Sequence, residues 1–331
     1  MTLESISENS PTISALVCTF NRGPSIVDTV SSILAIDHPH FEFVIIDQST
    51  NDEAEQATLC FRADPRFKFV RSKTVGKGEA LDHGLKETTG DLIAITDDDC
   101  TVPSNWLEMF QSIFAKHKDI AVCFCNVDPA QHDPSAGFIP HYVRTSDKLI
   151  RTLGDMCGSR AIGAGMAVRR SMVENLGGFD TMLGPGAWFP DGDDFDIKSR
   201  AILAGYQVYE SSTFSVTHYG FRTWQQGREL ARRNYLGLGA AHSKPFKCGR
   251  WAFIVVLINE LGRYIFWSPI WDILRWRRTG GFTRLTAFVR GFIGGLSVPV
   301  DKATMKFIDP RLQSGTAIHE EALFQRSHLE R

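Results

Sequence analysis

The chain has 331 residues, 43% of them hydrophobic, which is enough to bury one large core and to carry an additional segment. The net charge of −2 hides an asymmetry, because residues 244–290 contain nine Lys or Arg against Glu260 and Asp272, a local +7 that leaves −9 for the remainder. Seven cysteines without a CxxC pair favour neither a disulfide framework nor a zinc site, and the polar start of the chain is unlike a secretory signal, so we expect a reduced compartment.

Strand and helix patterns alternate along the first part of the chain. Short apolar runs predict strands over 13–20, 41–50, 66–72, 91–99 and 120–127, and helical spacing predicts helices over 25–35, 78–88 and 103–117. Residues 128–160 read as loop-rich, 161–178 as a strand followed by a helix, and 215–218 as the end of a further strand. This alternation predicts an α/β fold with a doubly wound, mostly parallel sheet covered by helices on both faces.

Polar residues follow these strands at their carboxyl ends, where ligands bind in doubly wound sheets. They are Thr19 to Arg22, Asp47, and the run Asp97, Asp98 and Asp99. On an extended backbone Asp97 and Asp99 would project to one side and Asp98 to the other. Two convergent carboxylates suit a hard divalent cation whose shell a bound phosphate completes. A solvated acidic turn is the alternative interpretation of the same three residues.

A second acidic group lies about 95 residues later, in PDGDDFDI at 190–197, directly before a predicted helix. Asp193 and Asp194 are either first-turn acids favoured by the helix dipole or, close to a metal-bound nucleotide, carboxylates that can take a proton from an acceptor hydroxyl. His218, at the end of the predicted strand, is either a packing residue or a metal ligand.

The order of these motifs over residues 13 to about 240 resembles the catalytic domain of family 2 inverting glycosyltransferases, which use sugar nucleotides and have the GT-A fold. The resemblance rests on five stretches of this chain, which are TFNR at 19–22, IIDQSTND at 45–52, GKGEALDHG at 76–84, DDD at 97–99 and GDDFDI at 192–197. The chain departs from the family pattern at Gln48, which replaces an acid, at Thr74 and Asp82, where Asn is common, and at Asp193, which replaces Glu.

The resemblance implies a role for each of these residues. Asp99 is expected to be the main ligand of Mg²⁺ or Mn²⁺ and His218 a second ligand, while Asp194, beside Asp193, is expected to act as the base. The remaining residues implied in binding the nucleotide sugar are Thr19, Asn21, Arg22, Asp47 at the nucleobase, Lys77, Asp82, and Asp97 at the ribose or at the metal through water. Arg160 is a weaker candidate for a phosphate contact. One displacement would invert the anomeric centre of the sugar, which is expected to be UDP-linked.

The carboxyl-terminal part differs from the rest in its composition. Residues 251–300 contain four of the seven tryptophans among apolar and basic residues, but no uncharged run of about 18 to 20 residues that would span a bilayer. Such a pattern favours helices that lie on an anionic membrane surface, with a helical lid packed on the catalytic domain as the alternative. The continuous apolar stretches in this basic region argue against nucleic-acid binding.

We therefore divide the chain into a polar tail at 1–12, a GT-A glycosyltransferase domain at 13–245, an amphipathic membrane-associated region at 246–305 and a polar tail at 306–331. The expected location is the cytoplasmic face of a membrane, with a glycan or lipid-linked acceptor that residues such as Arg232 and Arg233 would contact. Two alternatives are a nucleotidyltransferase, for which TFNRGPS is a poor phosphate loop, and a catalytically silent membrane-anchored binding homologue.

Overall fold

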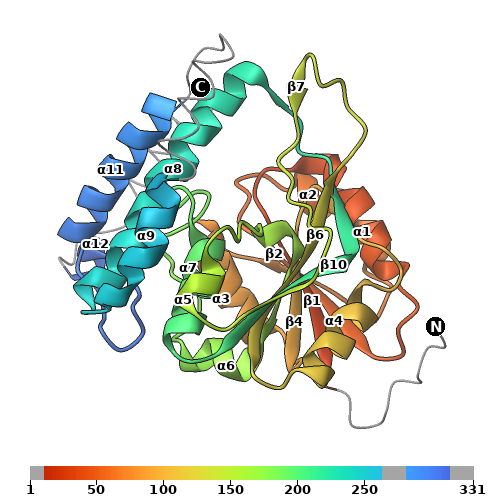
Figure 1. The fold of residues 1–331 in the computed structure, drawn as a ribbon. Helices are drawn as coiled ribbons and strands as arrows, with labels where there is room; N and C mark the ends of the chain where they lie inside the picture. Colours follow the sequence, from red (N-terminus) through yellow and green to blue (C-terminus); the bar gives the residue numbers. More distant parts are fainter. Residues whose placement is uncertain (1–10, 263–280, 314–331) are drawn as a thin grey trace.

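The computed structural model describes residues 11–262 and 281–313 (Figure 1). Within them nine strands form one sheet in the order β3-β2-β1-β4-β9-β6-β10-β5, with β8 paired to β10, while β7 and β11 form a separate ribbon. The strands are β1 (Ile13–Thr19), β2 (Phe41–Asp47), β3 (Phe67–Arg71), β4 (Leu92–Asp97), β5 (Cys100–Thr101), β6 (Ile120–Pro129), β7 (Gly137–Phe138), β8 (Lys148–Ile150), β9 (Met166–Arg169), β10 (Gln207–His218) and β11 (Arg222–Thr223).

The sheet is mixed, which corrects the expectation of a mostly parallel one. Strands β1 to β4 are parallel where they pair, and β6 is parallel to β10, but β9 lies antiparallel between β4 and β6, and β5 and β8 are antiparallel to β10. The loop-rich residues after β6 return the chain to the carboxyl end of β4, where Met166 pairs with Ile95. Strand β9 must therefore run backwards, and its Arg169 pairs with Leu92 at the start of β4.

Helices cover both faces of the sheet, as the alternating pattern predicted. Apolar side chains of α1 and α4 pack with Ala15 and Val17 on one face, and those of α3, α6 and α7 pack with Leu16 and Val44 on the other. This is the period-two division expected of a strand buried on both sides. The helices are α1 (Ile26–Leu34), α2 (Glu53–Ala57), α3 (Lys77–Glu87), α4 (Trp106–Lys116), α5 (Leu153–Met156), α6 (Arg170–Asn175), α7 (Asp193–Leu203), α8 (Trp224–Lys247), α9 (Ile254–Glu260), α11 (Gly281–Ser297) and α12 (Pro310–Gln313).

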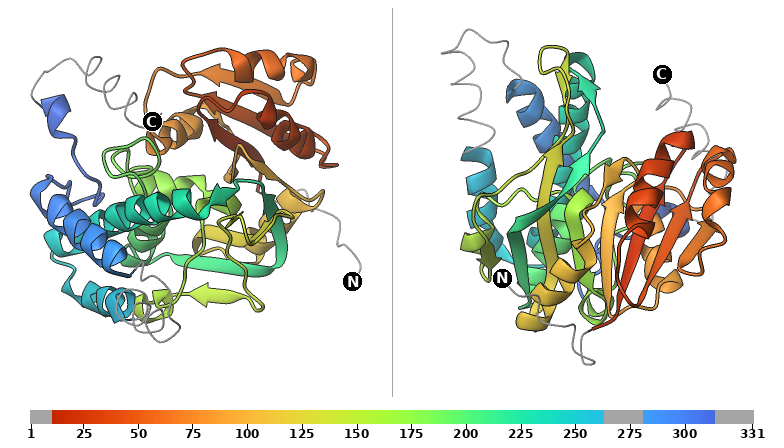
Figure 2. Two further views of the ribbon diagram at one scale, coloured as in Figure 1. Left: turned by 90° about the horizontal axis from the view of Figure 1, so that it is seen from above. Right: turned by 90° about the vertical axis from the view of Figure 1, so that its right-hand side faces the viewer.

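Helices α8, α9 and α11 form a further layer beside the sheet (Figure 2). Helix α8 begins with a capping box in which the Thr223 hydroxyl accepts from the Gln226 N–H and the Gln226 side chain accepts from the Thr223 N–H. It continues to Lys247 and so crosses position 245, where we expected a domain boundary. A Cβ added to Gly291 of α11 would lie 1.9 Å from the carbonyl oxygen of Leu236, so only glycine permits this close packing of α11 on α8.

Buried charges fix the end of α8 to the part of the molecule that contains the sheet. The ammonium group of Lys244 contacts the carboxylates of Asp180 and Asp196, and the guanidinium of Arg200 donates to Asp196 at 2.8 Å. The backbone N–H of Phe307 donates to Asp180 at 2.8 Å. Residues at the start of the predicted tail 306–331 thus pack against the fold.

The structure also bears on the predicted membrane-associated region. Across residues 11–262 and 281–313, every helix is too short or too polar to cross a bilayer. The tryptophans at 267, 271 and 276 lie outside the described residues, as do most of the predicted amino-terminal tail and residues 314–331.

Candidate active site

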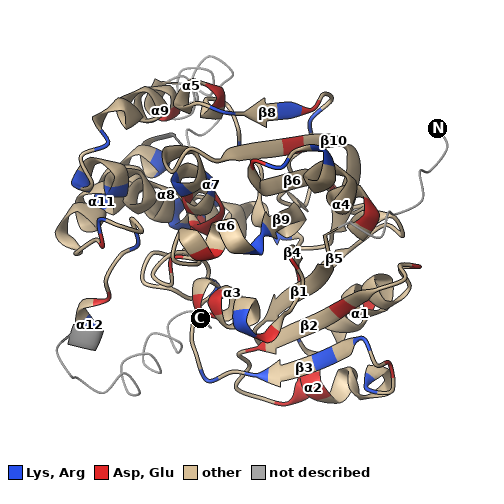
Figure 3. Ribbon diagram, turned by 90° about the horizontal axis from the view of Figure 1, so that it is seen from below, with Lys and Arg blue, Asp and Glu red and all other residues tan. Residues whose placement is uncertain are grey.

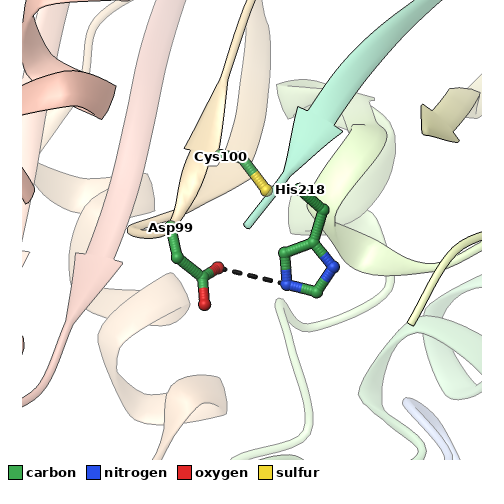
Figure 4. A group of neighbouring side chains, drawn as sticks. All are labelled: Asp99, Cys100 and His218. Carbon is green, nitrogen blue, oxygen red and sulfur yellow. Dashed lines mark ion pairs between the residues drawn. The ribbon is translucent and has the colours of Figure 1, made fainter. Parts of the chain in front are cut away.

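The acidic run at 97–99 lies where β4 ends and the chain turns into β5. Asp97 is the last residue of β4, Asp98 and Asp99 form a turn, and Cys100 pairs with His218 in the antiparallel register of β5 and β10. This pairing brings Asp99 against the imidazole, with Oδ1 of Asp99 3.3 Å from Nε2 of His218 (Figure 4).

The three carboxylates have three different cationic partners. Asp97 accepts from the ammonium of Lys77 at 2.6 Å, Asp98 accepts from the guanidinium of Arg22 at 2.6 and 2.9 Å, and Asp99 faces His218. The geometry differs from the extended backbone that we assumed, because the turn at 98–99 directs Asp98 back to the end of β1. Arg22, which also lies 3.1 Å from Asp99, therefore orients two of the three acids.

Asp99 and His218 have the geometry of two metal ligands. Nδ1 of His218 lies 2.7 Å from the carbonyl oxygen of Pro140, which can only accept, so Nδ1 carries the proton and Nε2 is the atom available to an ion. A Cβ added to Gly220 would lie 2.5 Å from this Nε2 and 3.0 Å from Oδ2 of Asp99. The glycine thus keeps open a space between a carboxylate and an imidazole, which suits Mg²⁺ or Mn²⁺.

Cys100 is the third residue of this group, and the sequence analysis did not single it out. One ligand atom from each of Asp99, Cys100 and His218 lies within 4.8 Å of the others. Burial raises the pKa of the Cys100 thiol, so it stays neutral and is a weak ligand for a hard cation. In the sequence, only its position directly after DDD could have indicated Cys100. It comes to lie opposite His218 through the pairing of β5 with β10, which the local sequence does not predict.

The pKa values of Asp99 and His218 move apart. Burial opposes ionisation of Asp99, but its hydrogen bond with His218 and the charge of Arg22 outweigh burial and lower its pKa. Burial also disfavours the imidazolium of His218, yet the interaction with Asp99 raises the pKa of the ring. The ion pair holds the two side chains in place, and an incoming cation would displace the proton on Nε2.

A second group of polar residues joins the ends of β1 and β2. The carboxylate of Asp47 is fully buried, where it accepts from the N–H of Ser49 at 2.9 Å and from the guanidinium of Arg71 at 2.9 Å. Asn21 has a φ of +51°, and its N–H donates to the hydroxyl of Ser49 at 2.8 Å while its side-chain oxygen accepts from the N–H of Thr50. Thr19 donates to Asp98 at 2.6 Å. Asn21 and Asp47 are therefore neighbours, and Ser49 and Arg71 complete the group; the predicted role of Asn21 and Asp47 in binding a nucleotide stays a prediction.

The second acidic group begins α7, which confirms the first-turn position of its carboxylates, while a role in proton transfer stays a prediction. Asp193 and Asp194 lie in the first turn of the helix, and Oδ2 of Asp194 accepts from the N–H of Gly163 at 3.1 Å. Burial raises the pKa of Asp193 to about 6 and raises the pKa of Asp194 as well, while the charge of Lys77 opposes both shifts.

Lys77 connects the two acidic groups. Its ammonium pairs with Asp97, and a Cβ added to Gly163 would lie 3.6 Å from that ammonium and 3.8 Å from Cβ of Asp194. The end of β4 and the start of α7 therefore face the same lysine, although they are far apart in the sequence.

A cavity of about 160 Å³ opens on the other side of Asp194. Its polar lining comes from four segments, and the residues include Arg160, Asp194, Lys198, Asn234, Tyr235, Asn259 and Glu260. The guanidinium of Arg160, our weaker candidate for a phosphate contact, pairs with Glu260 of α9. The chain brings these residues together from positions 100 apart, which no local pattern could have indicated.

Asp82, another predicted site residue, makes structural contacts, and within residues 11–262 and 281–313 none of them is a hydrogen bond or ion pair with the polar groups of the site. Its carboxylate accepts from the N–H of Phe179 at 2.6 Å and lies 3.3 Å from the ammonium of Lys306. These contacts hold a turn and the carboxyl-terminal segment on α3. Its role in binding a donor stays a prediction.

Comparison with known proteins agrees with this geometry. Residues 14–177 match the family described as Glycosyl transferase family 2. The chain is 35% identical over 217 residues to the uncharacterized glycosyltransferase YaiP of Escherichia coli, covering 62% of this chain and 51% of YaiP. It is 30% identical over 91 residues to the poly-beta-1,6-N-acetyl-D-glucosamine synthase of Staphylococcus epidermidis, covering 27% of this chain and 22% of the synthase. The chain thus spans about half of the length of YaiP and about a fifth of that of the synthase.

A solved structure shares the architecture. The mannosyltransferase PcManGT of Pyrobaculum calidifontis, in complex with GDP-Man and Mn²⁺, superposes with a TM-score of 0.58 at 17% identity, covering 97% of this chain and 84% of that one. At this identity the likeness shows a GT-A-like fold, and with the family match it confirms the resemblance drawn from the motifs.

Proposed function

From the match of residues 14–177 to glycosyl transferase family 2, we propose that the chain is a family member that transfers a sugar from a nucleotide-sugar donor to a hydroxyl acceptor with inversion of the anomeric carbon. A UDP-linked donor and a glycan or lipid-linked acceptor are the substrates we favour. The observation that carries the proposal is Lys77, which lies between Asp97 and the first turn of α7 and so joins a diphosphate-binding group to a candidate base.

Asp99 and His218 are the residues that would hold the divalent metal. When bound there, Mn²⁺ or Mg²⁺ would neutralise the charge that develops on the leaving diphosphate. The complex of PcManGT with GDP-Man and Mn²⁺ supports a divalent metal beside a nucleotide sugar in this fold. Asn21 and Asp47 would hold the nucleoside, with Asp97 at the ribose, while Thr19 and Arg22 orient Asp98 behind them.

Asp194 is the base of this mechanism. The acceptor hydroxyl gives its proton to the carboxylate of Asp194 as its oxygen bonds to the anomeric carbon, and the bond from that carbon to the diphosphate breaks on the opposite face. The Gly163 N–H orients the carboxylate, and the raised pKa of Asp194 brings its basicity closer to that of the hydroxyl.

The cavity beside Asp194 is where the acceptor hydroxyl would approach. It has room for little more than one sugar ring, and its polar lining offers hydrogen-bond partners to such a group. Arg232, exposed on α8 and 3.7 Å from the carboxylate of Glu229, extends this side of the molecule and could exchange that partner for an anionic acceptor.

A panel of nucleotide sugars tests the proposal by thermal stabilisation with Mn²⁺ and with chelator. We expect one donor to raise the melting temperature only with Mn²⁺, an effect that Asp99→Asn removes and the exposed control Asp119→Asn retains. The same donor should then yield a glycoside of inverted configuration, read by NMR. Stabilisation without any transfer or hydrolysis would favour the silent binding homologue, and a retained configuration would contradict the mechanism.

A further inference from the structure

Helices α9 and α11 expose apolar side chains that the proposed chemistry does not use. Phe282, Val289, Ile293 and Leu296 of α11 are 65%, 43%, 61% and 44% exposed, and their spacing of seven, four and three residues aligns them on one face of the helix. On the neighbouring α9, Ile258 is 62% exposed and lies one turn after Ile254. Trp251, immediately before α9, is 71% exposed.

The opposite face of α11 is also apolar, and it is the face that packs on the protein. Ala287 and Phe288 are buried with Tyr235 of α8, and Leu257 of α9 packs against the same cluster. A helix that is apolar on both faces needs a second partner for its outer face. Figures 1 and 2 show α9 and α11 side by side at the edge of the molecule.

The charges around this face are basic. Helix α11 contains no acidic residue, as Figure 3 shows. Its Arg290 is exposed, whereas the guanidinium of Arg284 lies 5.7 Å from the ring of Tyr235 on the packed side, and Arg250 is exposed just before Trp251. The acid of α9, Glu260, is buried and points inward to Arg160. Apolar stripes with tryptophan and arginine at their margins match the headgroup region of an anionic bilayer.

We propose that α9 and α11 dock on the surface of an anionic membrane through this exposed apolar face, with the helices lying along the surface. The inner face of α9 carries Val256, Asn259 and Glu260, which line the cavity beside Asp194. Because α9 lies between its docked face and the cavity, docking would place the cavity about one helix diameter, roughly 10 Å, from the membrane surface. Resting on the proposed function, the acceptor is therefore a sugar or phosphate group that is carried on a lipid and reaches this distance.

Vesicle sedimentation of the full chain tests the docking without any substrate. We expect binding to vesicles of phosphatidylcholine with phosphatidylglycerol, weaker binding at high salt, and little binding to phosphatidylcholine alone. Ile258→Asp and Ile293→Asp should each lower the partition coefficient at least about tenfold. The matched control is Leu59→Asp in η2 (Leu59–Phe61), which is 43% exposed on a different part of the fold and should bind as the parent does.

Three results would overturn the proposal. The first is sedimentation that does not depend on anionic lipid or on Ile258 and Ile293. The second is a dimer in light scattering that Ile293→Asp dissociates, which would assign the face to a second copy of the chain. The third is a cross-link between Ile293→Cys and residues 263–280 in the absence of vesicles, which would assign the face to that segment of the chain. Ile258→Asp and Ile293→Asp should both keep the donor-dependent thermal stabilisation. This readout does not involve the membrane, so it separates a failure of docking from a failure of the proposed function.

Discussion

The acidic turn at 97–99 and the acidic residues at 191–194 face the same lysine but are stabilised in different ways. Each carboxylate of the turn has a cationic partner, and the pKa of Asp99, the proposed metal ligand, is lowered. Burial raises the pKa of Asp98 even though Arg22 opposes the shift, so the contrast with the second group concerns Asp99. In the second group burial outweighs the nearby positive charge, so the pKa values of Asp191, Asp193 and Asp194 are raised.

This difference separates two kinds of chemistry within one site. Carboxylates that stay ionised can hold a cation and its phosphate, whereas carboxylates with raised pKa values can exchange a proton near neutral pH. We therefore assign metal binding to the turn and proton transfer to the start of α7, and a separate variant can test each role.

The largest expected effect is that of Asp194→Asn. The amide keeps the shape of the side chain but cannot take a proton, so we expect kcat to fall about 10²- to 10⁴-fold while donor affinity stays near that of the parent. Steady-state transfer kinetics and donor titration measure the two quantities. If the variant instead loses donor affinity and keeps kcat, Asp194 would bind the donor or the metal and would not be the base.

Lys244→Met tests Asp196, a carboxylate of α7 that, unlike Asp193 and Asp194, has two cationic partners. Lys244 and Arg200 lower the pKa of Asp196 against the effect of burial, and removing Lys244 leaves Asp180 and Asp196 buried beside too little positive charge. We expect a loss of about 3–5 kcal/mol in the free energy of unfolding, measured with urea. Lys302→Met, at an exposed position, is the control and should change stability little.

Gly220→Ala tests the space between Asp99 and His218. The added methyl would contact Nε2 of His218 and Oδ2 of Asp99, so we expect Mn²⁺ affinity to fall about tenfold or more in calorimetric titration with nucleotide present. The control is Gly262→Ala, where an added Cβ meets nothing within 4 Å. Equal affinities in the two variants would argue that the ion binds elsewhere.

The smallest expected effect is a shift in the pH profile. Asp194 is active as a base only when ionised, so kcat/KM should be lost as the pH falls through its raised pKa. The charge of Lys198 lowers that pKa, and Lys198→Gln should move the acidic limb to higher pH by about one unit or less. A limb that moves to lower pH would show that another group controls it.

Local patterns predicted much of this fold and part of the site. The strands that end at Thr19, Asp47 and Asp97 lie within a few residues of the predicted ranges, and their polar ends gather as the parallel arrangement requires. Short apolar runs carry no direction, however, so the four residues of β9 gave no sign that they run antiparallel.

The missed features depend on tertiary contacts. Cys100 joins the site through the pairing of β5 with β10, and the cavity forms from residues on four separate segments. Helix α8 ends at Lys247, two residues beyond the boundary that we predicted from composition, and the pairing of Lys244 with two buried carboxylates near this end is a tertiary contact that composition could not indicate.

Diffraction at the manganese absorption edge, from crystals grown with Mn²⁺ and the donor found in the panel, tests the central claim most directly. The account predicts an anomalous peak within bonding distance of Asp99 Oδ and His218 Nε2, with the anomeric carbon of the sugar facing Asp194. A peak away from these two ligands, or a sugar whose anomeric carbon faces away from Asp194, would contradict it.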